Sequence, residues 1–171
     1  MLNAAADGDP PSLVASDIGC YSLGALPPHS IADSLVCMGA SIGMAKGAAE
    51  AGSDRVVATI GDSTFLHSGI QSLVDAAEAN TPMTVIILDN GTVAMTGGQQ
   101  PAASSTRLES IVRGIGVPAE HVITVRPTEK STEENAALVR RELEYNGLSV
   151  IISRRNCVKV KPQRERVRDE V

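Results

Sequence analysis

Two polar turns, each placed directly after an apolar run, carry the side chains best suited to bind a charged ligand. Residues 61–63 (Gly-Asp-Ser) end the first run, and residues 89–91 (Asp-Asn-Gly) end the second. In an open parallel sheet the carboxyl ends of the strands lie along one edge, where ligands bind. Asp62 and Asn90 are therefore expected to meet, and their oxygens suit a hard cation such as Mg²⁺.

A cation held by these two side chains would need further ligands. Mg²⁺ prefers six near-octahedral oxygens and commonly takes some of them from phosphates and water. The backbone carbonyl of Thr92 would add a third protein oxygen, and Ser63 and Thr64 begin a predicted helix whose free N–H groups suit a phosphate. The pattern indicates a phosphate-bearing cofactor held through its metal. Taken singly, however, each turn is also an ordinary turn or helix-cap sequence.

The composition of the 171-residue chain is that of a single globular domain. Aromatic residues make up only 2%, and the net charge is −5, although residues 154–171 carry seven basic against three acidic side chains. Without aromatic interleaving or a nucleic-acid motif, this basic end is interpreted as a solvated tail or linker. Nucleic acid is therefore not expected as a partner. No apolar run approaches the roughly 20 residues of a membrane helix, so a membrane is not expected as a partner either.

Three cysteines, Cys20, Cys37 and Cys157, are odd in number and form no CxxC pair. This usage favours reduced thiols and a cytoplasmic location. Three thiols are also too few for a four-thiolate iron–sulfur cluster made by this chain alone. No basic segment followed by an apolar core opens the chain, so no signal peptide is expected.

Apolar runs alternate with helical patterns along the chain, which predicts an α/β fold. The connections are short, so the natural arrangement is a parallel sheet with helices on both faces. The predicted domain covers residues 13–157, after an irregular lead-in at 1–12 and before a charged tail or linker at 158–171. Ser131 and Glu134 have the spacing of a capping box for the last helix. Strands are predicted at 13–16, 56–60, 83–88, 122–125 and 148–152, and helices at 37–51, 65–79, 106–114 and 133–145.

The two turns and their spacing resemble the thiamine diphosphate motif, usually written GDG, about 25 residues, NN. Here Gly-Asp-Ser is followed by 25 residues and then Asp-Asn, so Ser63 and Asp89 depart from the pattern while Asp62 and Asn90 keep it. The surrounding sequence resembles the C-terminal thiamine-binding domain of indolepyruvate ferredoxin oxidoreductase, within the 2-oxoacid:ferredoxin oxidoreductases. The segments that carry this resemblance, over about residues 13–157, are DIGCY (17–21), CMGASIGMA (37–45), GDSTF (61–65), HSGI (67–70), LDN (88–90) and AMTG (94–97).

The resemblance implies a Rossmann-like thiamine diphosphate-binding fold and a role for each turn. Asp62, Asn90 and the carbonyl of Thr92 would bind Mg²⁺. Met95 would be the apolar wedge that holds thiamine bent, although a methionine is more often core filler. The residues implied in cofactor binding are Ile18, Gly19, Cys20 and Tyr21 around the ring, Gly61, Ser63 and Thr64 at the diphosphate, and Ala94 and Met95 beyond the metal loop.

The reaction implied by the resemblance is the oxidative decarboxylation of 2-oxo acids, with indolepyruvate-like aryl pyruvates as substrates. The acyl group would leave on coenzyme A, and the electrons would pass to ferredoxin through iron–sulfur clusters held elsewhere in the complex. The cofactor would carry the difficult chemistry. An activating Glu would come from a pyrimidine-binding domain or subunit that no segment here resembles, so the chain is expected to be inactive alone.

Within this chain the catalytic residue is unknown from the sequence, with His67, early in the helix after Asp62, as a candidate. A homodimer is also expected from the resemblance. Cys37 is expected to be a small packing residue and His121 a surface residue.

Two other functions are compatible with the same residues. The metal motif is shared with non-redox thiamine diphosphate decarboxylases and carboligases, and a cofactor-binding module without turnover would carry the same turns. The cysteine-bearing turn at residues 17–21 favours the oxidoreductase.

Overall fold

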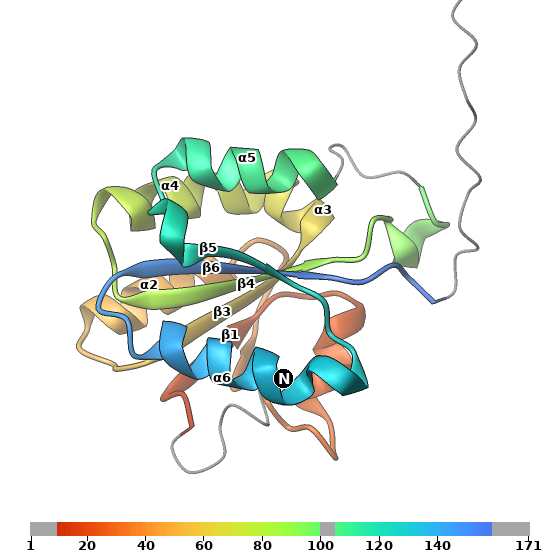
Figure 1. Cartoon of the computed structure of the whole chain (residues 1–171), viewed down its shortest axis with the longest axis horizontal. Helices are drawn as coiled ribbons and strands as arrows, with labels where there is room; N and C mark the ends of the chain where they lie inside the picture. The colour runs from red at the N-terminus through yellow and green to blue at the C-terminus, as the bar shows by residue number, and fades with distance from the viewer. Residues whose placement is uncertain (1–9, 100–104, 159–171) are drawn as a thin grey trace, which may run out of the picture.

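The computed structural model describes residues 10–99 and 105–158, and within them the chain forms one parallel sheet. The strand order is β2-β1-β3-β4-β6-β5, and every neighbouring pair is parallel (Figure 1). This confirms the predicted α/β class. The strands of the described ranges are β1 (Leu13–Ser16), β2 (Ser34–Leu35), β3 (Val56–Gly61), β4 (Met83–Asp89), β5 (Val122–Val125) and β6 (Leu148–Arg154).

Helices connect the strands and cover both faces of the sheet (Figure 1). The longer ones are α2 (Ser41–Glu50), α4 (Ile70–Glu78), α5 (Ser105–Ile115) and α6 (Thr132–Leu143). The short α3 (Asp62–Thr64) continues through a π-helical turn, η2 (Phe65–Gly69), into α4. Short 3-10 turns complete the described elements: η1 (Cys20–Ala25), η3 (Ala94–Thr96), η4 (Ala119–His121) and η5 (Glu129–Ser131).

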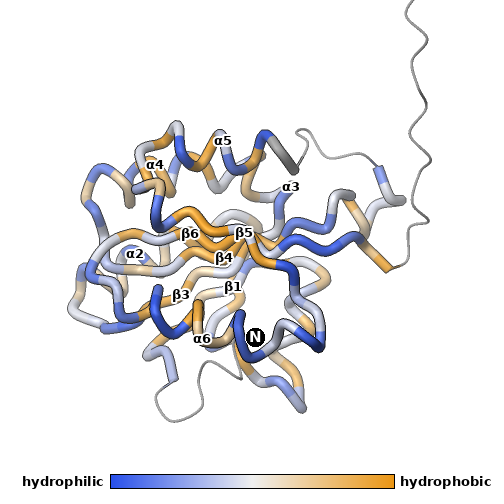
Figure 2. The backbone as a smooth tube through the Cα atoms, viewed as in Figure 1, coloured by the Kyte–Doolittle hydropathy of each residue, from blue (hydrophilic) through white to orange (hydrophobic). Residues whose placement is uncertain are grey.

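The core lies on the two faces of the central strands. On one face α2, α4 and α5 pack against the sheet through buried residues such as Ile42, Leu73 and Val112. On the other face α6 packs through residues such as Val139. Because β3, β4 and β6 are covered on both faces, nearly all their residues are buried, and these central strands are mostly orange to white in Figure 2.

The structure corrects three details of the predicted elements. The helix predicted from residue 37 begins only at Ser41, since Gly39 has a φ of +90° that a helix does not accommodate. The two-residue edge strand β2 was not predicted. The capping box is formed by Thr128 and Ser131 rather than by Ser131 and Glu134, because the extra turn η5 begins the helical segment earlier.

Two predicted regions fall mainly outside the described residues. The lead-in at 1–12 is described from residue 10, and the charged tail at 158–171 only at its first residue. Within the described ranges, no helix combines the length and the apolar character that crossing a membrane requires.

Candidate functional site

The carboxyl ends of β3 and β4 bring the two polar turns together. These strands are neighbours, with Gly61 paired to Leu88, so the residues that follow each strand emerge side by side. The backbone N–H of Gly91 in the turn after β4 lies near enough to the Asp62 carboxylate to favour its charged form. Two turns that are distant in sequence therefore form one site at this edge of the sheet.

Asp62 is buried, being only 6% exposed, and its environment does not favour the charged form. Burial raises the pKa of its carboxyl above the ordinary value, and the nearby Asp89 raises it further. The hydrogen bond from the N–H of Ser63, at 2.8 Å, and the nearby N–H of Gly91 act in the opposite direction. A cation beside Asp62 would stabilise the charged form that burial disfavours.

The turn after β4 is held in a defined shape. The side-chain oxygen of Asn90 accepts a hydrogen bond from the N–H of Thr92 at 3.0 Å, and the Thr92 hydroxyl donates to the Gln99 carbonyl at 3.0 Å. Gly91 has a φ of +68°, a conformation that suits glycine. The same turn leads into η3, where Met95 is 70% exposed and Ala94 is half-buried.

The side chain of Asp89 is buried and lies between two donors. Its Oδ1 accepts from the Gly91 N–H at 3.2 Å, and its Oδ2 accepts from Nε of Arg154 at 2.8 Å. Arg154 ends β6, 65 positions further along the chain. Arg154 was not predicted as a partner of Asp89. The available signal was Asp89 itself, a carboxylate where the thiamine motif has an asparagine.

The turn at residues 18–21 lies against the end of β3. The Gly61 N–H donates to the Tyr21 hydroxyl at 2.9 Å, and a Cβ on Gly61 would lie 3.1 Å from the Tyr21 ring. Burial raises the pKa of Tyr21 well above its usual range, so the phenol stays protonated. In the same turn Gly19 packs against that ring, while Ile18 and Cys20 are exposed.

Asp17, which the sequence analysis assigned no role, anchors this turn. Its side chain is completely buried, and its two oxygens accept from the N–H of Gly39 at 2.6 Å and of Ser41 at 2.8 Å. Asp17 therefore caps the start of α2 from 24 residues away. The expectation that Cys37 is a packing residue is wrong: it is exposed, since it precedes α2 instead of belonging to it.

The helical segment at the site begins at Asp62, one residue before the expected start, and Ser63 and Thr64 lie in its first turn. Thr64 is buried and Ser63 half-buried, and the N–H of Ser63 already donates to Asp62. His67 lies in the π-helical turn η2 and is exposed.

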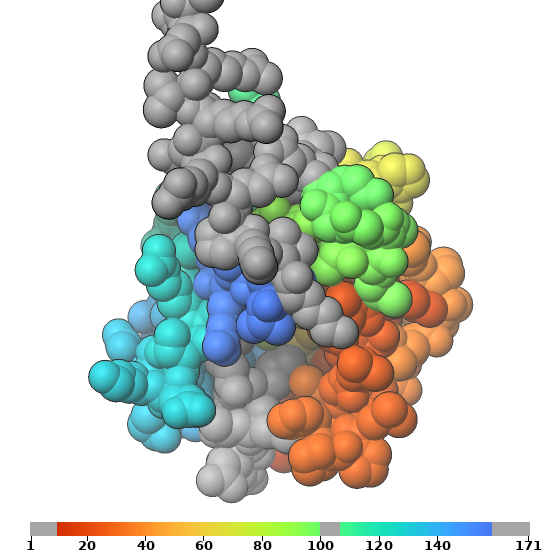
Figure 3. Space-filling model, turned by 90° about the vertical axis from the view of Figure 1, so that its right-hand side faces the viewer, coloured from red at the N-terminus to blue at the C-terminus, as the bar shows by residue number. Residues whose placement is uncertain are grey.

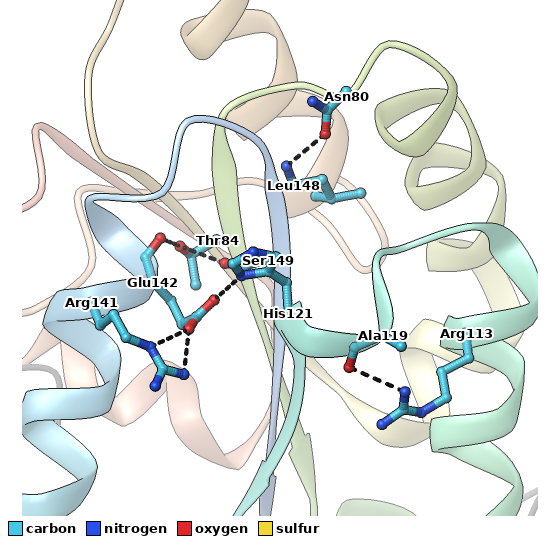
Figure 4. Close-up of polar contacts among 9 residues, drawn as sticks. All are labelled: Asn80, Thr84, Arg113, Ala119, His121, Arg141, Glu142, Leu148 and Ser149. Atoms are coloured by element: carbon cyan, nitrogen blue, oxygen red, sulfur yellow. Dashed lines mark hydrogen bonds and ion pairs between the residues drawn. The ribbon is translucent and has the colours of Figure 1, made fainter.

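His121 is not the surface residue that was expected. Its Nδ1 lies 2.8 Å from Glu142, whose side chain is fully buried and also accepts from Arg141 (Figure 4). The His121 ring also stacks on that of Tyr145. This cluster lies where β4 and β5 begin, close to Thr84, and so at the edge of the sheet opposite the site. It stabilises the fold away from the polar turns.

The donors at the β3–β4 edge fit a metal that brings other ligands with it. Among residues 10–99 and 105–158, no group of three or more His, Cys, Asp and Glu side chains has the arrangement to hold a metal ion. A cation here would use the Asp62 carboxylate, amide and carbonyl oxygens of residues 90–92, and ligand phosphates. Hard oxygen donors of this kind suit Mg²⁺, and the fit to a metal-bound diphosphate is good.

Comparison with known proteins agrees with this geometry. Residues 17–153 match the family model described as thiamine pyrophosphate enzyme, C-terminal TPP binding domain. The chain is 43% identical over 154 residues to the indolepyruvate oxidoreductase subunit IorA of Methanothermobacter thermautotrophicus, covering 84% of this chain and 24% of that protein. It is 39% identical over 152 residues to the IorA subunit of Archaeoglobus fulgidus, with 83% and 24% covered. The chain thus spans about a quarter of the length of these relatives.

Solved structures with the same fold include enzymes of different activity. The 2-oxoglutarate:ferredoxin oxidoreductase of Magnetococcus marinus superposes with a TM-score of 0.63 at 17% identity, over 85% of this chain and 54% of that one. The thiamine diphosphate-dependent 4-hydroxybenzoylformate decarboxylase of Rhodococcus jostii gives a TM-score of 0.62 at 19% identity, over 90% and 31%. At these identities the likeness concerns the fold alone.

Proposed function

The chain belongs to the thiamine pyrophosphate enzyme family as a C-terminal TPP-binding domain, and from this premise we propose that it is the cofactor domain of a 2-oxoacid:ferredoxin oxidoreductase. The proposed substrates are indolepyruvate-like aryl pyruvates, oxidised to acyl-CoA with ferredoxin as electron acceptor. The observation that carries the proposal is the meeting of Asp62 with the turn after β4 at the carboxyl edge of the sheet.

The sequence relatives, and not the fold, favour the oxidoreductase over a non-redox decarboxylase. The two solved structures superpose about equally well, yet one is an oxidoreductase and the other a decarboxylase. The curated relatives at 39% and 43% identity carry the name indolepyruvate oxidoreductase. A decarboxylase or carboligase domain therefore stays the second candidate.

The roles proposed for individual residues follow the geometry of the site. Asp62, Asn90 and the carbonyl of Thr92 would hold Mg²⁺, and Ser63 and Thr64 would lie at the diphosphate. Thiamine diphosphate, when bound, supplies the nucleophilic carbon and the electron sink that decarboxylation requires. The turn at residues 18–21, fixed to the end of β3, would line the ring, with Ala94 and Met95 beyond the metal.

A partner for the site is proposed from an apolar surface around it, which we call the edge surface. Exposed apolar side chains of the loops after β1, β2 and β4 form it. Figure 3 looks onto this face, where the segments near residues 20–40 and 90–99 share one half of the view. Apolar side chains gathered beside a site mark an interaction surface. Its members are Ile18, 44% exposed, Leu23, 69%, Leu26, 58%, Val36, 61%, Met38, 62%, and Met95, 70%.

We propose that a pyrimidine-binding domain or subunit of the same enzyme covers the edge surface and brings the activating Glu. The chain alone would then bind cofactor without turnover. Coenzyme A, ferredoxin, iron–sulfur clusters elsewhere in the complex and a homodimer belong to the same proposal, by analogy with the relatives.

Thermal unfolding of the 171-residue chain tests the cofactor site. Binding to the native state alone stabilises it by about 2.7 kcal/mol at 100 times the dissociation constant. For a chain of this size that raises the unfolding midpoint by about 5–10 °C. The rise should require thiamine diphosphate and Mg²⁺ together and should be lost in Asp62→Ala.

Asp54→Ala is the matched control, because this exposed aspartate precedes the opposite end of β3. It should keep the full rise. An unchanged midpoint in the wild-type chain at saturating cofactor and metal, or a rise that survives in Asp62→Ala, would refute the proposed site. To separate the two candidate reactions, the chain is co-expressed with its partner and given indolepyruvate: an oxidoreductase requires coenzyme A and reduces a viologen dye, whereas a decarboxylase requires neither.

A further inference from the structure

The Asp89 carboxylate is a second negative charge at the proposed metal site. Its side chain is only 2% exposed. Asp89 accepts from the N–H of Gly91 at 3.2 Å, and the same N–H lies near enough to Asp62 to lower the pKa of that carboxyl, so the two carboxylates lie close to one backbone group. Two carboxylate charges this close repel each other unless a cation compensates one of them.

The end of β6 supplies that compensation. Asp89 and Arg154 are register partners in β4 and β6, and the guanidinium Nε of Arg154 donates to Asp89 at 2.8 Å. The backbone beyond β6 continues the contact: the N–H of Arg155 donates to the Asp89 carbonyl at 2.9 Å, and that of Cys157 to the Asn90 carbonyl at 3.1 Å. Residues 154–157 therefore hold both the charge and the backbone of the turn after β4.

We propose that Arg154 is a positioning residue of the metal site, which it serves by pairing with Asp89. The pair offsets the charge of Asp89 at the site and fixes the backbone from which Asn90 projects. Asp62 is then the carboxylate left for the metal, so the cation must take further oxygens from the diphosphate. In this way Arg154 makes metal binding depend on the cofactor. The inference rests on the proposed function.

Mn²⁺ is the probe, because it resembles Mg²⁺ in its ligands and its binding is followed by electron paramagnetic resonance. Arg154→Gln releases the charge of Asp89, while the Gly91 N–H still holds that carboxylate near Asp62. A divalent cation then meets two carboxylates, and the Coulomb gain tightens Mn²⁺ binding without thiamine diphosphate by at least about tenfold. An arginine that was merely structural would weaken metal binding, with or without the cofactor.

Two further variants complete the design. Asp89→Asn combined with Arg154→Gln removes both charges and should restore the cofactor dependence of Mn²⁺ binding. Arg155→Gln is the matched control, since its side chain donates to the Pro127 carbonyl and not to Asp89. It should bind Mn²⁺ as the wild type does.

The unfolding midpoint without any ligand gives an independent reading. Breaking a buried ion pair is strongly destabilising, so Arg154→Gln should lower the midpoint by about 5 °C or more, and the double variant should recover most of that loss. If the cofactor raises the wild-type midpoint but Arg154→Gln binds Mn²⁺ no tighter, the proposed function stands and this inference is wrong. If the cofactor has no effect on the wild type, the proposed function fails. In that case the unfolding midpoints without ligand decide on the ion pair alone. If the double variant is no more stable than Arg154→Gln, the pairing of Arg154 with Asp89 is refuted, and if it is more stable, the pairing is supported.

Discussion

Replacing Asp17 should cost more stability than replacing any exposed carboxylate, although Asp17 precedes an irregular loop. Its completely buried side chain accepts the N–H groups of Gly39, at 2.6 Å, and Ser41, at 2.8 Å. In Asp17→Ala both donors lose their partner inside the protein. Each charge-assisted hydrogen bond contributes about 1.5–3 kcal/mol, so the two together predict a loss of about 3–6 kcal/mol. The variant also loses a negative charge that interacts favourably with the N-terminus of α2, which adds to the loss of stability.

Asp17→Asn separates the two contributions. An asparagine offers one acceptor oxygen, while its NH₂ group would face the other backbone N–H, so about half of the loss should remain. For a chain of 171 residues the alanine variant should unfold about 6–24 °C below the wild type, at about 2–4 °C per kcal/mol. Loosening α2 also loosens the turn at residues 18–21, and thiamine diphosphate binding should weaken with it.

Urea denaturation followed by circular dichroism measures these differences. Asp75→Ala is the control, because the Asp75 side chain is 70% exposed and pairs with Lys46 at the surface. Exposed ion pairs are worth about 0.2–1 kcal/mol, so this variant should stay close to the wild type. A loss below about 1 kcal/mol in Asp17→Ala, or an asparagine variant as stable as the wild type, would refute the assignment of Asp17 as the cap of α2.

Two further predictions concern buried carboxylates. The raised folded-state pKa of Asp62 means that its contribution to stability is fully present in acid and is lost as the pH rises through that pKa. Asp62→Asn should therefore unfold at higher urea than the cofactor-free wild type at pH 7, a difference that shrinks near pH 3.5. At the opposite edge, Glu142→Ala removes the buried acceptor of a half-buried histidine, His121, and of Arg141, whose side chain is 65% exposed, and should cost about 1–3 kcal/mol, whereas the exposed Glu144→Ala should cost little. Equal urea midpoints for Asp62→Asn and the wild type at pH 7, or for Glu142→Ala and Glu144→Ala, would contradict the reasoning.

The elements that the sequence predicted well are those whose burial is written into neighbouring residues. Strands covered on both faces must be apolar throughout, so β3 and β4 were recognisable as runs, and the polar residues that ended them marked the edge of the sheet. The position of Asp62 opposite the turn after β4 follows from parallel pairing of consecutive strands, which needs no knowledge of side-chain packing.

The details that were wrong depend on contacts between distant parts of the chain. The start of α2 is shifted by the carboxylate of Asp17, which no local helix signal includes. His121 looks like a surface residue until α6 brings Glu142 beneath it.

The sequence by itself determined the fold class, the two polar turns and their 25-residue spacing, because each depends on local pattern and strand order. Only the tertiary structure decided which positively charged side chain pairs with Asp89. Arg154 lies 65 positions away in the chain and reaches Asp89 because β6 lies beside β4 in the sheet. The strand that follows β4 in the chain, β5, lies instead on the far side of β6. Strand order of this kind is set by packing of the whole domain, so the charge at the site could not be deduced from the turns alone.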